Sequence, residues 1–103
     1  MKRTRLVSAT RLTKQAFWEQ SLLGQSLLAM PDLLRPELAL RFENDGPSRV
    51  GLPTLYNRAL EACPDDRYLL LVHDDVYLHD TFVEQRIDEG LQENDVLGLA
   101  GSR

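Results

Sequence analysis

The chain has 103 residues, of which 43% are hydrophobic and 27% charged, so we expect one globular domain spanning 1–103 and exclude disordered, fibrous and disulfide-stapled classes. The net charge of −4 argues against a nucleic-acid partner, because a basic face supplies most of the affinity for phosphate backbones. Cys63 is the one cysteine, and no apolar run approaches the about 20 residues of a membrane span, so we expect a cytoplasmic protein without a transmembrane segment.

The N-terminal third predicts a strand followed by a helix. Arg5–Thr10 is β-prone and ends in small polar residues. Thr13 is a suitable N-cap, and the apolar residues after it recur at helical spacing. This pattern predicts one amphipathic helix over 13–30, with a mild weakness at Gly24. Packing in or beside the core is expected for its two aromatic residues, Phe17 and Trp18.

Basic residues gather near the N-terminus. The cluster comprises Lys2, Arg3 and Arg5, with Arg11 and Lys14 close behind. Such a cluster could bind a polyanion, or it could simply form a charged surface in contact with water. Because the chain as a whole is acidic, the sequence favours a solvated, charged N-terminus.

The middle of the chain predicts a break, a strand, a turn and a second helix. The two prolines of Pro31–Pro36 disfavour helix. In Glu37–Glu43 apolar and polar residues alternate with the period of a half-buried strand. The segment Asn44–Ser48 is rich in turn residues. A helix is then expected over Pro53–Cys63, because proline suits the first helical turn.

The last third predicts strand, helix and strand. Tyr68–His73 is an unbroken apolar run, typical of a central parallel strand buried on both faces. Asp80–Gly90 is expected to be a helix capped by Asp80, and Asp95–Ala100 a short strand. Strands and helices thus alternate, which predicts a three-layer α/β/α fold with a mostly parallel sheet of about four strands. One side of the Asp80–Gly90 helix is apolar: Phe82, Val83, Ile87 and Leu91.

Ligands of open α/β sheets bind beyond the carboxyl ends of the strands. Polar residues expected there are Ser8, Thr10, Glu43, Asn44, Asp74, Asp75 and Ser102, beside Gly101. The adjacent acids Asp74 and Asp75 follow the Tyr68–His73 strand directly, which suits a hard divalent cation such as Mg²⁺ or Mn²⁺. The same acids could instead turn the chain and cap the next segment. His73 and His79 lack the partners and spacing of a zinc site, and a histidine beside carboxylates more often orients them.

Two segments resemble the nucleotide-sugar-binding half of GT-A glycosyltransferases. Gly51–Ala62 is a Gly-led helix with Asn57 midway, and Tyr68–Leu78 is a hydrophobic strand ending in His-Asp-Asp. Inverting family 2-type transferases have a helix of this kind before a strand that ends in a DxD-like motif, and one bacterial subgroup has the His-Asp-Asp variant. The segments Arg5–Thr10, Phe17–Trp18 and Val96–Gly101 are similar to that subgroup too.

The resemblance implies a Rossmann-like fold that binds a nucleotide-diphosphate sugar and transfers the sugar to an acceptor. It implies that Asp75 coordinates a Mn²⁺ or Mg²⁺ ion bridging the diphosphate, and that Asp74 contacts the metal or the ribose. Ser8 and Thr10 stand where relatives touch the nucleotide. His73 stands where many relatives have the first acid of the motif, which is a departure.

Two further departures leave other functions open. The family usually has two strands where Leu38–Phe42 supplies one, and the chain ends at Arg103, before the acceptor-binding half and its catalytic base. We therefore expect a truncated copy or a half completed by a partner chain, with catalytic residues unknown. The alternative is a non-catalytic α/β interaction module or degenerate remnant. A metal-dependent phosphoryl enzyme is the third possibility, with Ser8 or Thr10 as a weak nucleophile candidate.

Overall fold

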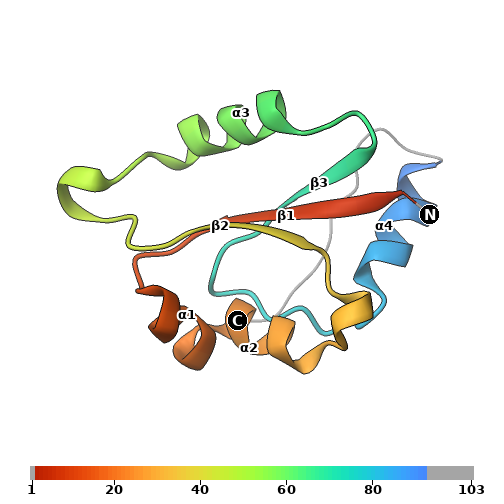
Figure 1. Ribbon diagram of the computed structural model, residues 1–103, viewed down its shortest axis with the longest axis horizontal. Coiled ribbons are helices and arrows are strands. Elements are labelled where there is room, and N and C mark those ends of the chain that lie inside the picture. The colour runs from red at the N-terminus through yellow and green to blue at the C-terminus, as the bar shows by residue number, and fades with distance from the viewer. Residues whose placement is uncertain (1, 93–103) are drawn as a thin grey trace.

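A computed structural model describes residues 2–92 of the chain. Three parallel strands form one sheet in the order β2-β1-β3 (Figure 1). The strands are β1 (Arg3–Ala9), β2 (Glu37–Arg41) and β3 (Arg67–Leu71). The helices are α1 (Lys14–Gln20), α2 (Leu22–Ala29), α3 (Leu52–Ala62) and α4 (Val83–Leu91), with 3-10 turns η1 (Asp32–Leu34) and η2 (Gly46–Ser48).

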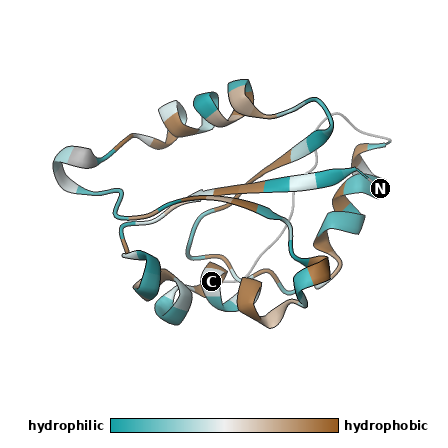
Figure 2. Ribbon diagram, viewed as in Figure 1, coloured by the Kyte–Doolittle hydropathy of each residue, from teal (hydrophilic) through white to brown (hydrophobic). Residues whose placement is uncertain are grey.

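Helices cover both faces of the sheet and so give three layers. In Figure 1, α3 lies over one face, and α1, α2 and α4 lie on the other. The hydrophobic core fills the second side, and Figure 2 shows how the hydrophobic residues concentrate in the strands and in α2. The predicted α/β class is confirmed, and the arrangement is compatible with part of a Rossmann-like fold. The strand predicted over Asp95–Ala100 lies outside the described residues. The buried apolar members of the core are Leu6, Phe17, Leu23, Leu27, Met30, Val72, Leu78, Val83 and Ile87.

β1 is the central strand of the three, not the Tyr68–His73 segment that the sequence favours. Thr4, Leu6 and Ser8 of β1 are buried, and they alternate with residues that face the α3 side. β3 is only half-buried, and Leu71 in it is 38% exposed. The prediction of burial on both faces is wrong because α3, the helix over that face, packs loosely and has no buried residue.

The single helix predicted over 13–30 is also wrong, because Ser21 divides it into α1 and α2. The backbone of Ser21 is extended (φ −79°, ψ 147°), and this residue caps the end of α1 and the start of α2. Its hydroxyl donates to the carbonyl oxygen of Phe17 at 2.7 Å and accepts from the Gly24 amide at 2.8 Å. A Cβ on Gly24 would clash with that same carbonyl oxygen. Gly24, a weak point in the predicted long helix, is thus required at the junction of the two short helices, because a side chain there would clash with Phe17.

Several other predictions are confirmed. Thr13 caps α1, since its side chain accepts from a first-turn amide at 3.2 Å. α2 ends before Pro31, β2 occupies the first five residues of the predicted strand 37–43, and Pro53 lies in the first turn of α3. Phe17 is buried and Trp18 packs beside the core. Among residues 2–92, no helix is both long enough and apolar enough to cross a membrane.

The start of α4 differs from the prediction. Asp80 lies outside the helix, and its carboxylate accepts from the Phe82 amide at 2.9 Å and pairs with Arg86 at 2.6 Å. These two interactions hold the pKa of Asp80 below its ordinary value. Phe82, predicted on the apolar side, is 52% exposed because it precedes the first helical turn, whereas Val83 and Ile87 are buried as predicted.

Two acids of α4 turn inward and bind the amino end of β1. Glu84 is 4% exposed, and its carboxylate accepts from the Thr4 amide at 2.8 Å and from Arg3 Nε at 2.9 Å. Asp88 accepts from the Lys2 amide at 3.2 Å. Burying a carboxylate is costly unless it is paired and hydrogen-bonded, and both conditions hold for Glu84. These contacts anchor α4 to the sheet.

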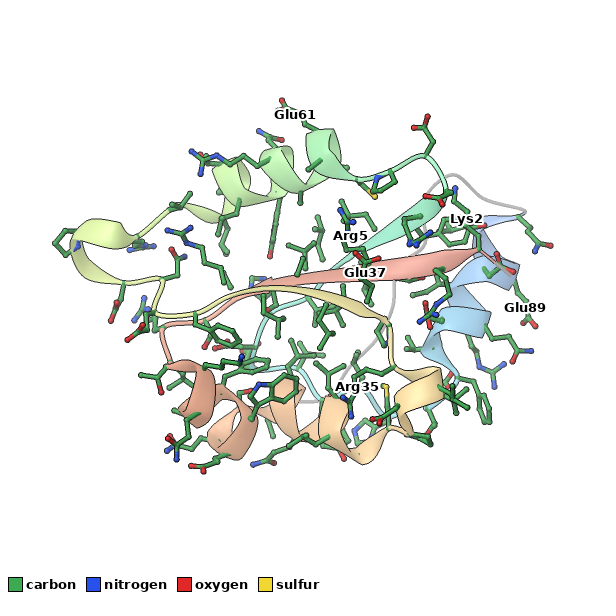
Figure 3. The ribbon with its side chains drawn as sticks, viewed as in Figure 1. Lys2, Arg5, Arg35, Glu37, Glu61 and Glu89 are labelled. Carbon is green, nitrogen blue, oxygen red and sulfur yellow. The ribbon has the colours of Figure 1, made fainter. Side chains whose placement is uncertain are left out.

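The same end of the sheet carries a second charged group, made of one residue from each strand. Arg5 of β1 and Arg67 of β3 pair with Glu37 of β2 at 2.8 Å and 3.1 Å, and Figure 3 labels Arg5 and Glu37 side by side. Arg5 also donates to the Ala62 carbonyl oxygen at the end of α3, at 3.3 Å. The two arginines of the basic cluster thus pair with acids distant in the chain, and Lys2 lies over the Tyr68 ring at 4.5 Å. Arg3 stays 47% exposed, so the charged terminus predicted from the sequence also carries ion pairs that the sequence does not show.

Candidate functional site

A pocket of about 360 Å³ lies at the carboxyl end of the sheet, where the segments after β1, β2 and β3 meet. The chain leaves β1 for a strand on one side and later returns to a strand on the other side. Such a reversal of strand order is where open α/β sheets bind ligands. The polar side of the pocket is formed by Thr10, Arg11, Asn44, Arg49, His73 and Asp74.

Main-chain hydrogen bonds join the segments that follow β1 and β2. The Thr10 amide donates to the Arg41 carbonyl oxygen at 2.9 Å, and the Asn44 amide donates to the Thr10 carbonyl oxygen at 2.8 Å. One step further, the Glu43 amide donates to the Leu12 carbonyl oxygen at 2.9 Å. The pairing of the two strands thus continues into the loops, which gives the pocket a defined backbone wall.

Thr10 and Asp74, both predicted site residues, meet in the pocket. The Thr10 hydroxyl donates to Asp74 Oδ2 at 2.7 Å and accepts from the Leu12 amide at 3.2 Å. The Asp74 carbonyl oxygen accepts from the Leu23 amide in the first turn of α2, at 3.1 Å. The main chain and the side chain of Asp74 are therefore both held by hydrogen bonds. The half-buried side chain lines the pocket, and its second carboxylate oxygen takes no part in the hydrogen bond to Thr10.

Asn44 closes the loop between β2 and α3. This side chain is 8% exposed. Its oxygen accepts from the Val50 amide at 2.8 Å and from Arg41 Nε at 3.0 Å, while its nitrogen donates to the Val50 carbonyl oxygen at 3.0 Å. The sequence predicts Asn44 at the ligand edge, and the structure gives it a positioning task there. It fixes the loop that carries Arg49.

Arg11 and Arg49 line the pocket, and neither was predicted as a ligand-binding residue at this end of the sheet. Arg11 follows Thr10 just beyond the end of β1, but in the sequence it stands close behind the N-terminal basic cluster. Arg49 follows the Asn44–Ser48 turn, and one residue, Val50, separates it from Gly51 at the start of the predicted helix. A basic residue directly after a strand, and another just before a helix N-terminus, would have been a usable signal, because both places border the carboxyl end of the sheet.

Of the other predicted residues, Gly101 and Ser102 lie outside the described part of the chain, His73 lines the pocket, and Ser8 and Asp75 do not line it. Ser8 lies on the buried face that β1 shares with Leu6, is 3% exposed, and its hydroxyl has no hydrogen-bond partner among residues 2–92. Asp75 is exposed and does not line the pocket. His73 is exposed and lines it, whereas the ring of His79 packs on Tyr77 with centroids 4.8 Å apart.

The pocket therefore offers one carboxylate where the sequence predicts two. Within the part of the chain that the structure describes, no three His, Cys, Asp or Glu side chains are grouped so as to hold a metal ion. Magnesium sites often use one or two carboxylates together with substrate phosphates and water. Asp74 fits such a contact, and the metal-binding role of Asp75 stays a prediction.

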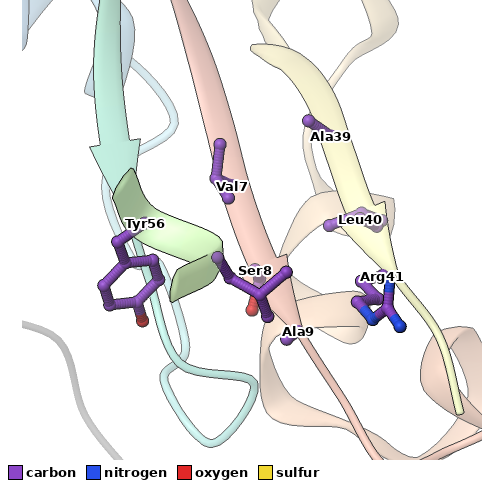
Figure 4. Close-up of a pocket in the computed structure, with 8 residues that line it drawn as sticks. Val7, Ser8, Ala9, Ala39, Leu40, Arg41 and Tyr56 are labelled. Atoms are coloured by element: carbon purple, nitrogen blue, oxygen red, sulfur yellow. The ribbon is translucent and has the colours of Figure 1, made fainter. Parts of the chain in front are cut away.

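A second pocket of about 270 Å³ lies between the sheet and α3 (Figure 4). Its walls are mainly apolar, with Val7 and Ala9 of β1 and Ala39 of β2 on one side. Tyr56 of α3 and Arg41 of β2 add polar groups, and burial raises the pKa of the Tyr56 phenol above its ordinary value. This pocket reflects the loose packing of α3.

No family model matches the chain, and no curated protein or solved structure does so either.

Proposed function

We propose that the chain is a nucleotide-sugar-binding domain of the glycosyltransferase type, with its ligand in the pocket at the carboxyl ends of β1 and β3. One observation supports this most directly. The Thr10–Asp74 hydrogen bond of 2.7 Å lies in a pocket of about 360 Å³ at the reversal of strand order. The geometry supports binding, and we propose no catalytic residue for the sugar transfer.

Each wall of the pocket suits one part of such a ligand. Leu12, Val50 and Leu52 provide apolar surface for a nucleobase. The carboxylate of Asp74 is an acceptor for ribose hydroxyls, or a single ligand to a divalent cation between the phosphates. The Thr10 hydroxyl holds this carboxylate in place, so the acceptor is oriented before the ligand binds.

Calorimetric titration with UDP, GDP and ADP, each with Mn²⁺ and each with EDTA, tests the proposal. At least one nucleoside diphosphate is expected to bind. Asp74→Ala should weaken its affinity about tenfold or more, because a hydrogen bond to a charged group is lost. The matched control is Asp65→Ala, which removes an exposed acid in the segment between α3 and β3 and should leave the affinity unchanged. Absence of binding by all three nucleotides would overturn the proposal.

Asp75→Ala belongs in the same series because the sequence assigns that residue to the metal. If Asp75 contributes, the affinity measured with Mn²⁺ should fall in this variant, while the affinity measured in EDTA should not change. An affinity indifferent to Mn²⁺ and to Asp75→Ala would remove the metal prediction and leave nucleotide binding standing.

A second candidate, the non-catalytic interaction module, has one observation in its favour. Leu33 and Phe82 are 92% and 52% exposed, and both line a small hollow beside η1 and α4. Neighbouring exposed apolar side chains often mark a contact surface. Light scattering of the wild type and of Leu33→Ser distinguishes the cases, since self-association through this surface should be lost in the variant. A monomer at all concentrations would argue against self-association there.

A further inference from the structure

The charges that line the carboxyl-end pocket are mainly positive. Arg11 and Arg49 contribute two guanidinium groups, and Asp74 contributes one carboxylate that already accepts the Thr10 hydroxyl. The chain as a whole has a net charge of −4, so the local charge at this pocket is opposite in sign to the net charge. A local excess of positive charge in a pocket attracts anions.

Within residues 2–92, the guanidinium groups of Arg11 and Arg49 lack the carboxylate partners that Arg3, Arg5 and Arg67 have. Neither guanidinium forms an ion pair or a hydrogen bond with any residue between 2 and 92, and both side chains are exposed. Most arginines of the sheet, in contrast, pair with carboxylates. The guanidinium groups at the pocket therefore keep all their donors available for a ligand.

The backbone reinforces the positive charge. Leu52, the first residue of α3, lines the same pocket, and Gly51 before it provides no side chain to cap the helix. The N-terminus of α3, an eleven-residue helix, therefore lies at the pocket that Arg11 and Arg49 line. The amide groups at a helix N-terminus carry partial positive charge. Asn44 fixes the loop from 44 to 50 through its three hydrogen bonds, so Arg49 is presented from a braced segment.

From this arrangement we infer that Arg11 and Arg49 bind the phosphates of the ligand directly, so that the pocket holds a diphosphate without a divalent cation. A guanidinium presents a planar pair of donors that matches two phosphate oxygens, and it neutralises their charge as a cation would. The inference rests on the proposed function for the nucleoside part of the ligand. The phosphate part stands on the arginines alone.

The experiment is a calorimetric titration of the whole chain with inorganic pyrophosphate and, separately, with UDP, GDP and ADP, all in EDTA. Binding in EDTA is expected. Each of Arg11→Ala and Arg49→Ala should weaken it about tenfold, and the double variant more than either, because charge-assisted hydrogen bonds are lost. Arg11→Lys should fall between wild type and Arg11→Ala, since it keeps the charge but not the paired donors.

The control variant is Arg58→Ala, which removes the same charge from the exposed surface of α3 outside the pocket and should leave affinity unchanged. The guanidinium groups of Arg11 and Arg49 form no ion pair or hydrogen bond within residues 2–92, so thermal unfolding of the variants should match the wild type. Raising the salt concentration should weaken binding in the wild type more than in the double variant.

The possible results separate the two proposals. Binding of a nucleoside diphosphate only with Mn²⁺, and unaffected by the arginine variants, overturns direct phosphate binding and keeps the proposed function. Arginine-dependent binding of pyrophosphate that no nucleoside improves keeps the inference and overturns the proposed function. Absence of binding by every probe overturns both.

Discussion

The arginines at the two ends of the sheet have opposite electrostatic surroundings. At the amino end, Arg3, Arg5 and Arg67 each pair with a carboxylate at 2.8 to 3.1 Å. At the carboxyl end, Arg11 and Arg49 line a pocket and pair with no residue in the described range 2–92. The same residue type thus fastens strands and helix together at one end and faces open solvent at the other.

This difference shows that the density of basic residues along a sequence does not reveal which arginines stay unpaired in the fold. In the dense cluster at residues 2–5, Arg3 and Arg5 pair with Glu84 and Glu37, which folding brings from distant parts of the chain. Arg11 and Arg49 form no ion pair with any acid of residues 2–92. Which arginine is available for a ligand depends on pairing in the folded state.

The strongest way to break the amino end is Glu84→Ala. The variant leaves the buried Thr4 amide without its acceptor and separates α4 from β1, so the free energy of unfolding should fall by about 2–3 kcal/mol. Urea denaturation followed by circular dichroism measures the loss. Glu84→Gln keeps an acceptor and should lose less. Equal losses in both variants would show that the charge of Glu84, and not its hydrogen bond to Thr4, is what matters.

Gly24→Ala tests how the carboxyl end is held. A Cβ at Gly24 clashes with the Phe17 carbonyl oxygen, so the first turn of α2 must shift, at a cost of about 2 kcal/mol. The Leu23 amide in that turn donates to the Asp74 carbonyl oxygen. Because a shift of the turn would displace Asp74, ligand affinity should fall together with the free energy of unfolding. Gly51→Ala is the control, because the nearest atom to its Cβ would be Pro53 Cδ at 4.0 Å. An unchanged unfolding curve for Gly24→Ala would contradict the junction described here.

Asn44→Ala disturbs the carboxyl end while leaving both pocket arginines, Arg11 and Arg49, in the sequence; it also removes the acceptor of Arg41 Nε. Loss of the bonds to Val50 should lower the free energy of unfolding by about 1–2 kcal/mol. Pyrophosphate should then bind several-fold more weakly, since Arg49 is no longer braced. Asn44→Asp keeps the acceptor for the Val50 amide and should recover part of both losses. Titration and urea denaturation of the same samples compare the two effects.

The smallest expected effect is the pH dependence at Glu37. Hydrogen bonds from Arg67 and then Arg5 hold the pKa of Glu37 below its ordinary value of 4.5. A carboxylate with a lowered folded-state pKa stabilises the fold above its unfolded value, and the gain disappears as the pH falls through the folded value. Glu37→Gln should therefore be slightly less stable than the wild type at pH 7, by less than about 1 kcal/mol, because the side chain is partly exposed.

The check for this prediction is a set of unfolding curves between pH 7 and acid. The wild type and Glu37→Gln should converge as the pH falls below the ordinary carboxylate range, and high salt should narrow their difference at pH 7. A difference that grows toward acid would have the wrong sign for a paired carboxylate and would contradict the role given to Glu37.

Local sequence patterns were enough to predict the class of fold and most element positions. Hydrophobic periodicity, the Thr13 cap and the prolines at 31 and 53 are local signals, and local signals specify strands, helices and their ends. Strand order also placed Thr10 and Asp74 at the carboxyl end of the sheet, but the hydrogen bond between them was not predicted. These features required no knowledge of which residues pair across the fold.

Three features depend on contacts in the folded chain: the break between α1 and α2, the central place of β1 among the three strands, and which charges of residues 2–92 remain unpaired. Ser21 bonds to Phe17 and Gly24 in a junction that periodicity does not reveal, because apolar spacing continues through it. The neutralisation of Arg3 by Glu84 and the availability of Arg49 depend on contacts between distant segments. Electrostatic pairing is decided by distance in space, and the sequence records only distance along the chain.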